Sequence, residues 1–297
     1  MCAKARAFFA ERGILEVDCP ILSHYASVDT HIDLISANLA GDKLGYLHSS
    51  PEYPMKRLLS EGLGDIYQLN HVFRDGEHSP KHNPEFMMAE WYRVNGSFEA
   101  LIDETIAFIQ LFLGPVSSET LTYRQAFKKV TGLDSTLATP DTLISYLNDQ
   151  GFPTRETEKD ALLNLILGLF VEPQLGQETL TILRDYPATQ AALAQTVQRP
   201  DETIALRFEA YYLGVELANG YLELTQAQEQ RQRLVEANAA RLRQGKSSLP
   251  IDEYFLKALE TGLPPCAGVA VGFDRLMMLK HRCNDLSDVL PFGWDAV

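Results

Sequence analysis

The spacing of apolar residues along the chain predicts helices interleaved with strands. Apolar residues recur three and four positions apart in residues 4–12 and 98–113, which is typical of helices with one buried face. Gly13 follows the first of these segments and indicates its end. The same pattern predicts further helices at 51–61, 123–130, 141–150, 160–170, 227–244, 251–260 and 273–280.

Strand character is clearest in residues 65–74 and 86–94, where β-branched and aromatic residues recur. The segment 75–84 between them contains a glycine and two prolines, which oppose a helix. The two runs are therefore expected to pair as an antiparallel hairpin with a long loop. Other strands are expected at 14–17, 46–49, 203–223 with breaks at Gly214 and Gly220, and 269–272.

The elements follow one another as strands, then helices, then strands. This order favours an α+β domain, an antiparallel β-sheet flanked by helices, over an alternating parallel fold. The segment from about residue 114 to 200 is expected to be mainly helical. No internal repeat or low-complexity linker divides the chain, so we expect one domain over residues 1–297.

Composition narrows the class of protein. The chain has 297 residues, 45% hydrophobic and 22% charged, a balance typical of folded globular proteins. Its 26 basic and 40 acidic residues give a formal net charge of −14, which opposes a large nucleic-acid-binding surface. No apolar run reaches the roughly 18–20 residues that span a membrane, and the first residues lead us to expect no export signal. The four cysteines form no CxxC pair, so we expect reduced thiols and a cytoplasmic protein.

The loop between the two long predicted strands carries the most informative side chains. Arg74 ends the first strand and Phe86 begins the second, so a guanidinium group and an aromatic ring flank the loop. Arginine binds phosphate or carboxylate through paired hydrogen bonds, and the ring offers a flat face for a purine. His82 and Asn83 lie in the loop, where a polyphosphate could reach them. The alternative interpretation is an ordinary surface hairpin.

Two further sets of residues complete the candidate chemistry. Glu209 and Glu216 flank the Gly214 bend and could face each other on adjacent strands, where two carboxylates can bridge Mg²⁺. The alternative is two exposed acids in an acidic protein. Residues 268–276 form a strand of small residues that a ligand can approach closely, followed by a helix with Arg275 in its first turn. The alternative interpretation of residues 268–276 is that the small residues serve only close packing of the strand against the helix.

Taken together, these sets resemble motifs two and three of the class II aminoacyl-tRNA synthetases, and residues 12–20 resemble motif one. The resemblance is closest to lysyl-tRNA synthetase, covers nearly the whole chain, and implies a class II synthetase catalytic core. The stretches that carry it are SSPEYPMKRLL (49–59), HNPEF (82–86), MAEWY (88–92) and ELANGYLEL (216–224).

Lysyl-tRNA synthetases carry an N-terminal anticodon-binding domain, whereas motif one starts here almost at Met1. The chain therefore resembles the family of truncated paralogues that ligate lysine or (R)-β-lysine to elongation factor P. Trp91, and Ala270 where tRNA-charging enzymes usually have glycine, fit that family. We expect residues 1–297 to be one class II catalytic domain with no anticodon-binding domain. The helical segment at about 114–200 would then be an insertion between motifs two and three.

The resemblance implies that ATP is bound by the residues of motifs two and three. Arg74 and Arg275 would be catalytic. Arg74 would bind the α-phosphate and the substrate carboxylate, and Arg275 would enclose adenine together with Phe86. ATP contacts are implied for Arg74, Asp75, Gly76, Glu77, His82, Asn83, Phe86, Glu216, Leu217, Gly272 and Arg275.

The resemblance also implies how metal and amino acid are held. Glu209 and Glu216 would hold Mg²⁺. Glu90, Tyr92 and Glu223 would receive the distal ammonium group of the substrate, because a buried ammonium needs countercharge. Substrate contacts are implied for Ser50, Pro51, Glu52, Glu90, Tyr92, Asn219, Glu223 and Ala270.

One position departs from the family pattern. The family has a glutamate two residues after the motif-two arginine, where it accepts a hydrogen bond from the adenine amino group. In this chain that residue is Gly76, and the acid is Glu77. Either Glu77 substitutes through a shift of the loop, or the backbone at Gly76 contacts adenine.

The implied reaction has two steps. Lysine or (R)-β-lysine reacts with ATP to give an aminoacyl-adenylate and pyrophosphate, and the acyl group then passes to a lysine side chain of elongation factor P. Motif one implies a homodimer, and the missing anticodon domain implies no stable tRNA binding. No membrane association is expected.

Three alternatives remain open at the level of sequence. One is a stand-alone lysyl-tRNA synthetase-like enzyme that charges tRNA or another carrier. Another is a non-catalytic regulatory paralogue that binds amino acid or nucleotide, which the retained arginines and metal acids oppose. The third is a zinc hydrolase using His71, His78 and His82. Pro80 opposes it, because it keeps His78 and His82 from sharing a helix face.

Overall fold

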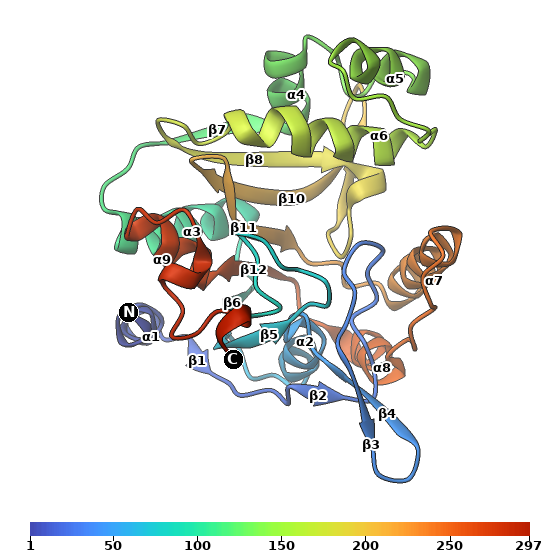
Figure 1. Ribbon diagram of the computed structural model, residues 1–297. Helices are drawn as coiled ribbons and strands as arrows, with labels where there is room; N and C mark the ends of the chain where they lie inside the picture. Colours follow the sequence, from blue (N-terminus) through green and yellow to red (C-terminus); the bar gives the residue numbers. More distant parts are fainter. The chain divides into compact units, whose positions relative to one another are not determined.

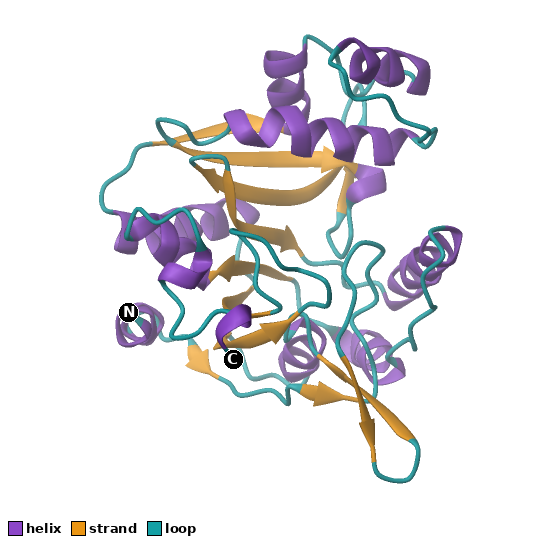
Figure 2. Ribbon diagram, in the orientation of Figure 1, coloured by secondary structure: helices purple, strands orange, loops and turns teal.

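The computed structural model describes all 297 residues and divides them into two compact units. The first unit comprises Met1–Leu113 and Glu223–Val297, and the second comprises Gly114–Leu222. Each unit combines a sheet with helices, and the element order is that of an α+β protein (Figures 1 and 2). The predicted fold class is confirmed.

The sheet of the first unit has the strand order β1-β5-β6-β12. Its strands β5 and β6 form the predicted antiparallel hairpin, with Ile66 opposite Tyr92 and Phe73 opposite Glu85. β6 also pairs antiparallel with β12, and β1 runs parallel to β5. The bounds are β1 (Leu15–Glu16), β5 (Ile66–Phe73), β6 (Glu85–Val94) and β12 (Cys266–Gly272).

Six α-helices belong to the first unit, and all six were predicted. Between α2 and α8 the rings of Tyr53 and Phe255 stack with their centroids 4.2 Å apart. This contact fixes α2, the helix whose first turns carry part of the candidate site. The bounds are α1 (Cys2–Ala10), α2 (Glu52–Ser60), α3 (Phe98–Leu113), α7 (Ala227–Arg243), α8 (Glu253–Gly262) and α9 (Phe273–Lys280).

An aromatic cluster forms the core between α1, α3 and the sheet. The ring of Phe9 lies 4.1 Å from that of Tyr67 and 5.3 Å from those of Trp91 and Phe108, measured between centroids. Phe9 is fully buried. The cluster therefore attaches the N-terminal helix to the hairpin β5–β6.

Phe9→Ala is expected to lower the free energy of unfolding by about 3–5 kcal/mol, because it removes a buried ring and leaves a cavity. The midpoint of urea denaturation measures the effect. Phe292→Ala is the matched control, since that ring is 69% exposed and its loss is expected to cost less than about 0.5 kcal/mol. Equal midpoints for the two variants would contradict the role given to Phe9.

A small second sheet in the first unit was only partly predicted. It has the order β2-β4-β3, with β2 (Leu22–Ser23), β3 (Ser36–Leu39) and β4 (Lys43–Leu47). The sequence analysis expected one strand at 46–49. The hairpin β3–β4 escaped it because most of its residues are at least partly exposed, so no apolar alternation marks it.

The sheet of the second unit has the order β11-β10-β8-β7, and β9 pairs with β10. The hairpin β10–β11 turns at Leu213 and Gly214, as predicted for Gly214, and both residues have positive φ. The predicted break at Gly220 is wrong, because β11 continues through it. The strands are β7 (Ser118–Thr122), β8 (Leu180–Pro187), β9 (Thr196–Gln198), β10 (Thr203–Tyr212) and β11 (Val215–Leu222).

The segment expected to be mainly helical contains the helices α4 (Tyr123–Thr131), α5 (Pro140–Asp149) and α6 (Lys159–Ile166). It also contains β7, β8 and β9, which the sequence analysis missed. The first four residues of β8 are all buried, so this strand lacks the alternation that reveals a half-exposed strand. The helix predicted to reach residue 170 changes after Ile166 into a π-helical turn, Leu167–Val171.

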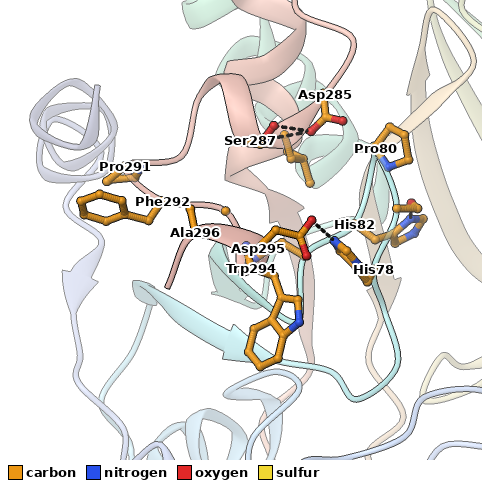
Figure 3. A pocket seen from close by; sticks show the side chains of 14 residues that line it. His78, Pro80, His82, Asp285, Ser287, Pro291, Phe292, Trp294, Asp295 and Ala296 are labelled. Atoms are coloured by element: carbon orange, nitrogen blue, oxygen red, sulfur yellow. Dashed lines mark hydrogen bonds and ion pairs between the residues drawn. The ribbon is translucent and has the colours of Figure 1, made fainter.

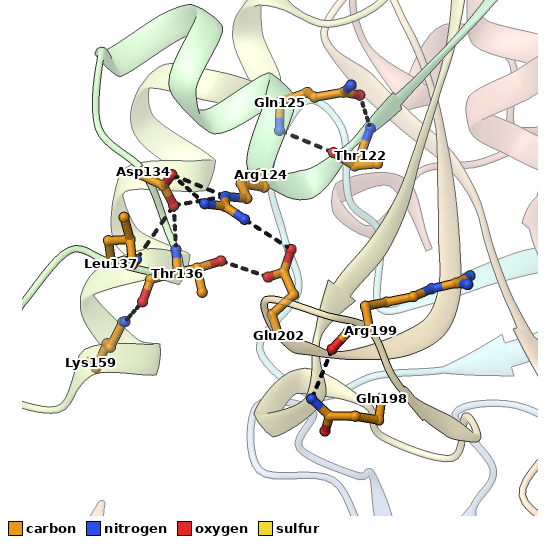
Figure 4. Close-up of polar contacts among 10 residues, drawn as sticks. All are labelled: Thr122, Arg124, Gln125, Asp134, Thr136, Leu137, Lys159, Gln198, Arg199 and Glu202. Carbon is orange, nitrogen blue, oxygen red and sulfur yellow. Dashed lines mark hydrogen bonds and ion pairs between the residues drawn. The ribbon is translucent and has the colours of Figure 1, made fainter.

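A polar network joins the helices of the second unit to its sheet (Figure 4). Arg124 of α4 donates to both oxygens of Asp134 at 2.8–3.0 Å and forms an ion pair with Glu202 at 3.7 Å. The hydroxyl of Thr136 donates to the other oxygen of Glu202 at 2.6 Å. These contacts hold α4 and the following loop against the segment that leads into β10.

None of the helices combines the length and the apolar character of a membrane-spanning segment. The four cysteines are free thiols, and two of them, Cys19 and Cys266, are buried.

Candidate active site

The strongest candidate site is a group of three carboxylates in the first unit, the buried Glu90 and Glu223 and the partly buried Glu52, which together with Lys56 we call the acid cluster. Glu90 on β6 is 2% exposed. Its Oε1 accepts a hydrogen bond from the Tyr92 hydroxyl and its Oε2 one from the Ser50 hydroxyl, both at 2.7 Å. No cationic side chain forms an ion pair with Glu90. The cluster thus holds a carboxylate oriented by neutral donors alone.

Lys56 supplies the positive charge of the acid cluster, and the sequence analysis missed it. Its Nζ lies 2.6 Å from Oε1 of Glu52, one helical turn earlier on α2, and 2.5 Å from Oε2 of Glu223. The Lys56 side chain is fully buried. The spacing of four residues between Glu52 and Lys56 was the available signal, since it places both on one helix face.

Burial and like charges perturb the pKa values of the acid cluster. Burial, with the charge of Glu52 adding to it, raises the pKa of Glu90 to about 7. Burial also raises the pKa of Glu223, against the opposing effect of Lys56. Burial alone would lower the pKa of Lys56, yet its two carboxylate partners raise it above the ordinary value. Lys56 is therefore an ammonium ion, and Glu90 titrates near neutrality.

Small residues on β12 lie opposite the polar residues of β6. Gly268 pairs with Tyr92 and Ala270 with Glu90, so these four share one face of the sheet. A Cβ on Gly268 would lie 2.5 Å from Oε1 of Glu223 and closer still to the ring of Tyr92. Glycine at position 268 is therefore required for these two side chains to keep their positions.

A second group of residues, at the end of the hairpin β5–β6, fits an anionic ligand. The Arg74 guanidinium lies 5.1 Å from the centroid of the Phe86 ring, and its Nη1 lies 3.6 Å from Glu77. The Nε of Arg74 is buried and has no hydrogen-bond partner. Gly76 adopts a φ of +73°, which turns the chain so that the acid reaching Arg74 is Glu77. A buried guanidinium N–H without an acceptor fits a phosphate or carboxylate oxygen.

Arg275, in the first turn of α9, contacts the loop between β5 and β6. It donates to the carbonyl of Lys81 at 3.1 Å, and its Nη2 lies 2.6 Å from Nε2 of His82. Nδ1 of His82 lies 2.8 Å from the Ser79 hydroxyl. Burial, and next the charge of Arg275, lower the pKa of His82, so the ring is neutral at neutral pH. The structure therefore brings His82 and Arg275 together.

The same loop forms one wall of a pocket of about 450 Å³, and the C-terminal segment forms the other (Figure 3). The backbone N–H of Trp294 donates to Oδ1 of Asn83 at 3.1 Å, and Nδ2 of Asn83 donates to the carbonyl of Glu85. Nε2 of His78 lies 3.4 Å from Oδ2 of Asp295. Of the predicted site residues, this pocket is lined only by His82 and Asn83.

In the second unit, the predicted metal acids lie on one face of the hairpin β10–β11. Glu209 pairs with Asn219, and Tyr211 pairs with Glu216. Leu217 has no partner, so it is one extra residue in β11, a β-bulge. The bulge turns Glu216 onto the face that carries Glu209 and Asn219. Oδ1 of Asn219 is buried without a hydrogen-bond partner, which fits a ligand donor.

The carboxylate of Glu209 already has three donors, Arg207 on Oε1 and the hydroxyls of Tyr186 and Tyr211 on Oε2. A carboxylate offers about four acceptor positions, so one remains for a cation. The oxygen chemistry of Glu209 and Glu216 therefore fits Mg²⁺, with the other ligands left to phosphate and water.

The remaining predicted site residues have simpler surroundings. Pro51 precedes α2 as its N-cap residue, and Gly272 holds the same position before α9. The backbone N–H of Asp75 donates to the carbonyl of Asp33 at 2.8 Å. His71 lies 3.4 Å from Glu85, so the three histidines considered for zinc make separate contacts.

The acid cluster and the group around Arg74 at the end of the hairpin β5–β6 are the two candidate binding sites of the first unit. Comparison with known proteins identifies the family to which the chain belongs. The chain belongs to the tRNA synthetases class II (D, K and N) family, whose model matches residues 1–296. It is 43% identical over 297 residues to an elongation factor P–(R)-β-lysine ligase of Avibacterium paragallinarum, covering 98% of this chain and 92% of that protein. It is also 43% identical over 299 residues to the enzyme of that name from Haemophilus influenzae, with 99% and 92% covered. The Vibrio vulnificus enzyme of that name is 41% identical over 300 residues, with 98% and 93% covered. The resemblance inferred from the motifs is confirmed.

Proposed function

We propose that this chain is a ligase that activates (R)-β-lysine or lysine with ATP and transfers the acyl group to a lysine side chain of elongation factor P. The observation that carries the proposal is Glu90, a buried carboxylate held by Ser50 and Tyr92 without a cationic partner. A diamino acid supplies the missing ammonium. The names of the relatives support the same substrate and acceptor.

The first step is formation of an acyl-adenylate. A carboxylate oxygen of the amino acid attacks the α-phosphorus of ATP, the bond from that phosphorus to the bridging oxygen breaks, and pyrophosphate leaves. Arg74 binds the carboxylate and the α-phosphate through its Nε and Nη groups and offsets the charge that develops. Phe86 and Arg275 enclose the adenine ring, and His82 and Asn83 contact the nucleotide.

Mg²⁺ would bind Glu209 and Glu216 and supply positive charge to the phosphates. Arg207 and the two tyrosines keep Glu209 in one rotamer through their hydrogen bonds. Leu217 and Gly272 contribute backbone contacts to ATP, as do Asp75, Gly76 and Glu77 from the loop. In this assignment the backbone at Gly76 contacts the adenine, because the Glu77 side chain is turned toward Arg74.

The second step forms an amide. The uncharged ε-amine of the acceptor lysine attacks the adenylate carbonyl, AMP leaves, and the amine releases a proton to solvent. No protein nucleophile is required, because the mixed anhydride is already activated and the enzyme holds the reactants together. We further propose that the protein acts as a cytoplasmic homodimer and binds no tRNA stably.

Two assays test the proposed function. With ATP, Mg²⁺ and (R)-β-lysine, the purified protein should release pyrophosphate, and on adding elongation factor P the factor should gain the mass of one β-lysyl group. Lysine in place of (R)-β-lysine measures the preference between the two. Efficient charging of tRNA with no modification of the factor would overturn the proposal.

The pKa of Glu90 predicts the pH dependence of substrate capture. Only the carboxylate form can pair with an ammonium, and the pKa of Glu90 is raised to about 7. We expect kcat/KM for (R)-β-lysine to rise about tenfold per pH unit below pH 7 and to level above it. Steady-state pyrophosphate release from pH 5.5 to 8.5 measures this.

Glu90→Gln is the matched variant for the pH experiment. It keeps acceptor and donor capacity beside Ser50 and Tyr92 but cannot titrate, so its lower kcat/KM should lack the rise centred near pH 7. The other charged groups facing this position are Glu52, Lys56 and Glu223. A wild-type profile that is flat between pH 6 and 8 would contradict the prediction.

A further inference from the structure

The acid cluster contains two buried carboxylates, a third (Glu52) that is 16% exposed, and one buried ammonium, so its net charge is −2 when all four groups are ionised. Glu52 and Glu223 share Lys56, and Glu90 has no cation. A lysine-like substrate whose carboxylate is bound by Arg74 brings two ammonium groups. The charge of the empty cluster therefore matches a diamino acid, and a monoamino acid would leave one negative charge buried and unbalanced.

We propose that Lys56 is a positioning residue that determines the specificity of the ligase for diamino acids. It fills the cation position between Glu52 and Glu223, so the substrate's distal ammonium is directed to Glu90. This inference rests on the proposed function, because it assumes that the cluster receives a substrate ammonium. It assigns a role to a side chain that does not itself react.

The contacts of Lys56 support a role for its charge in addition to its volume. The Nζ atom lies within 2.6 Å of oxygens from two different carboxylates, and the side chain has no exposed surface. The Phe255 ring centroid lies 6.0 Å from the Nζ, on the side of α8. A buried charge costs several kcal/mol to desolvate, and an apolar side chain of similar volume would fill the space without that cost. We therefore attribute the retained charge of Lys56 to its pairing with Glu52 and Glu223.

Removal of the Lys56 charge would create a competing site. Glu52 and Glu223 would stay in place and lose their cation, so a substrate ammonium could bind between them instead of beside Glu90. The amino acid would then be displaced relative to Arg74. A displacement of about 1 Å at a reacting group costs about 100-fold in rate. We expect Lys56→Met, which keeps an unbranched side chain only one atom shorter, to lower kcat/KM for (R)-β-lysine by about 100-fold.

The test measures ATP-dependent pyrophosphate release by the full chain with (R)-β-lysine. Wild type is measured first, and its failure to react would refute the proposed function and not the role of Lys56. Arg57→Met is the matched control, because Arg57 is the next cation on α2 and packs over the ring of Tyr254. It should keep wild-type kcat/KM. If Lys56→Met keeps more than a third of wild-type kcat/KM, the proposal is overturned.

A second variant separates charge from packing. Lys56→Ala removes three carbons and a nitrogen, the heavy atoms of propylammonium. Propylammonium should restore activity to Lys56→Ala, and 1-propanol, a neutral molecule with as many heavy atoms, should not. Wild type with propylammonium measures competition at the substrate site. Equal rescue by both molecules, or rescue by neither, would overturn the proposal. Loss of folding in both variants would assign Lys56 to stability and would also overturn it.

Discussion

Arg74→Met is expected to lower kcat/KM for pyrophosphate release by about 100- to 1,000-fold, the largest loss predicted for any single side chain of the nucleotide site. In the proposed reaction this guanidinium contacts both reactants of the first step. Its buried Nε has no acceptor within the protein, so its hydrogen-bonding capacity is left for the ligand. Methionine keeps most of the packing against Phe86 and removes the charge.

The effect of Arg74→Met should appear mainly in kcat, because the charge that Arg74 offsets is greatest in the transition state. Arg6→Met is the control, since Arg6 forms an exposed ion pair with Glu16 and lies outside the site. Both proteins should unfold at similar denaturant concentrations. A loss below about tenfold in Arg74→Met would refute the role given to Arg74.

Gly268→Ala is expected to reduce kcat/KM for (R)-β-lysine by about 100-fold. The added methyl group would overlap the ring of Tyr92 and lie 2.5 Å from Oε1 of Glu223, so one of these two side chains must move. Such overpacking costs about 1–3 kcal/mol and shifts the ammonium-binding groups out of place. The loss should appear in KM for the amino acid, with KM for ATP little changed.

Gly168→Ala is the matched control for Gly268→Ala. A Cβ at Gly168 would meet no atom within 4 Å, and Gly168 does not have a positive φ. It should keep wild-type kinetics and stability. Wild-type KM in Gly268→Ala would show that the pocket tolerates the methyl group and that the close contacts do not limit substrate binding.

The sequence could predict those strands and turns that are specified by residues close together in the chain. The hairpin β5–β6 follows from two strand-forming runs around a loop that contains Pro80 and Pro84. Gly214 lies in the turn between β10 and β11, where it takes a positive φ. Gly220 has the same residue type but lies inside β11, paired with Phe208, so glycine alone does not mark a break.

The acid cluster could be predicted only in part, because its members are distant in sequence. The resemblance to family motifs identified Glu90, Tyr92 and Glu223. Their proximity in the fold depends on the pairing of β6 with β12. Lys56 has the appearance of an ordinary helical surface residue until the packing of α2 shows it fully buried. Its role depends on tertiary burial, which no local pattern of polar residues encodes.

The β-bulge at Leu217 makes the count of residues between Glu209 and Glu216 a constraint in itself. Both acids share a sheet face only because β11 contains one more residue than its partner at that point. A regular ladder over the same residues would pair Leu217 with Tyr211 and turn Glu216 to the opposite side of the sheet, although every side chain of the candidate metal site would still be present. In this hairpin the register of the two strands, as much as the residue types, specifies the ligand set.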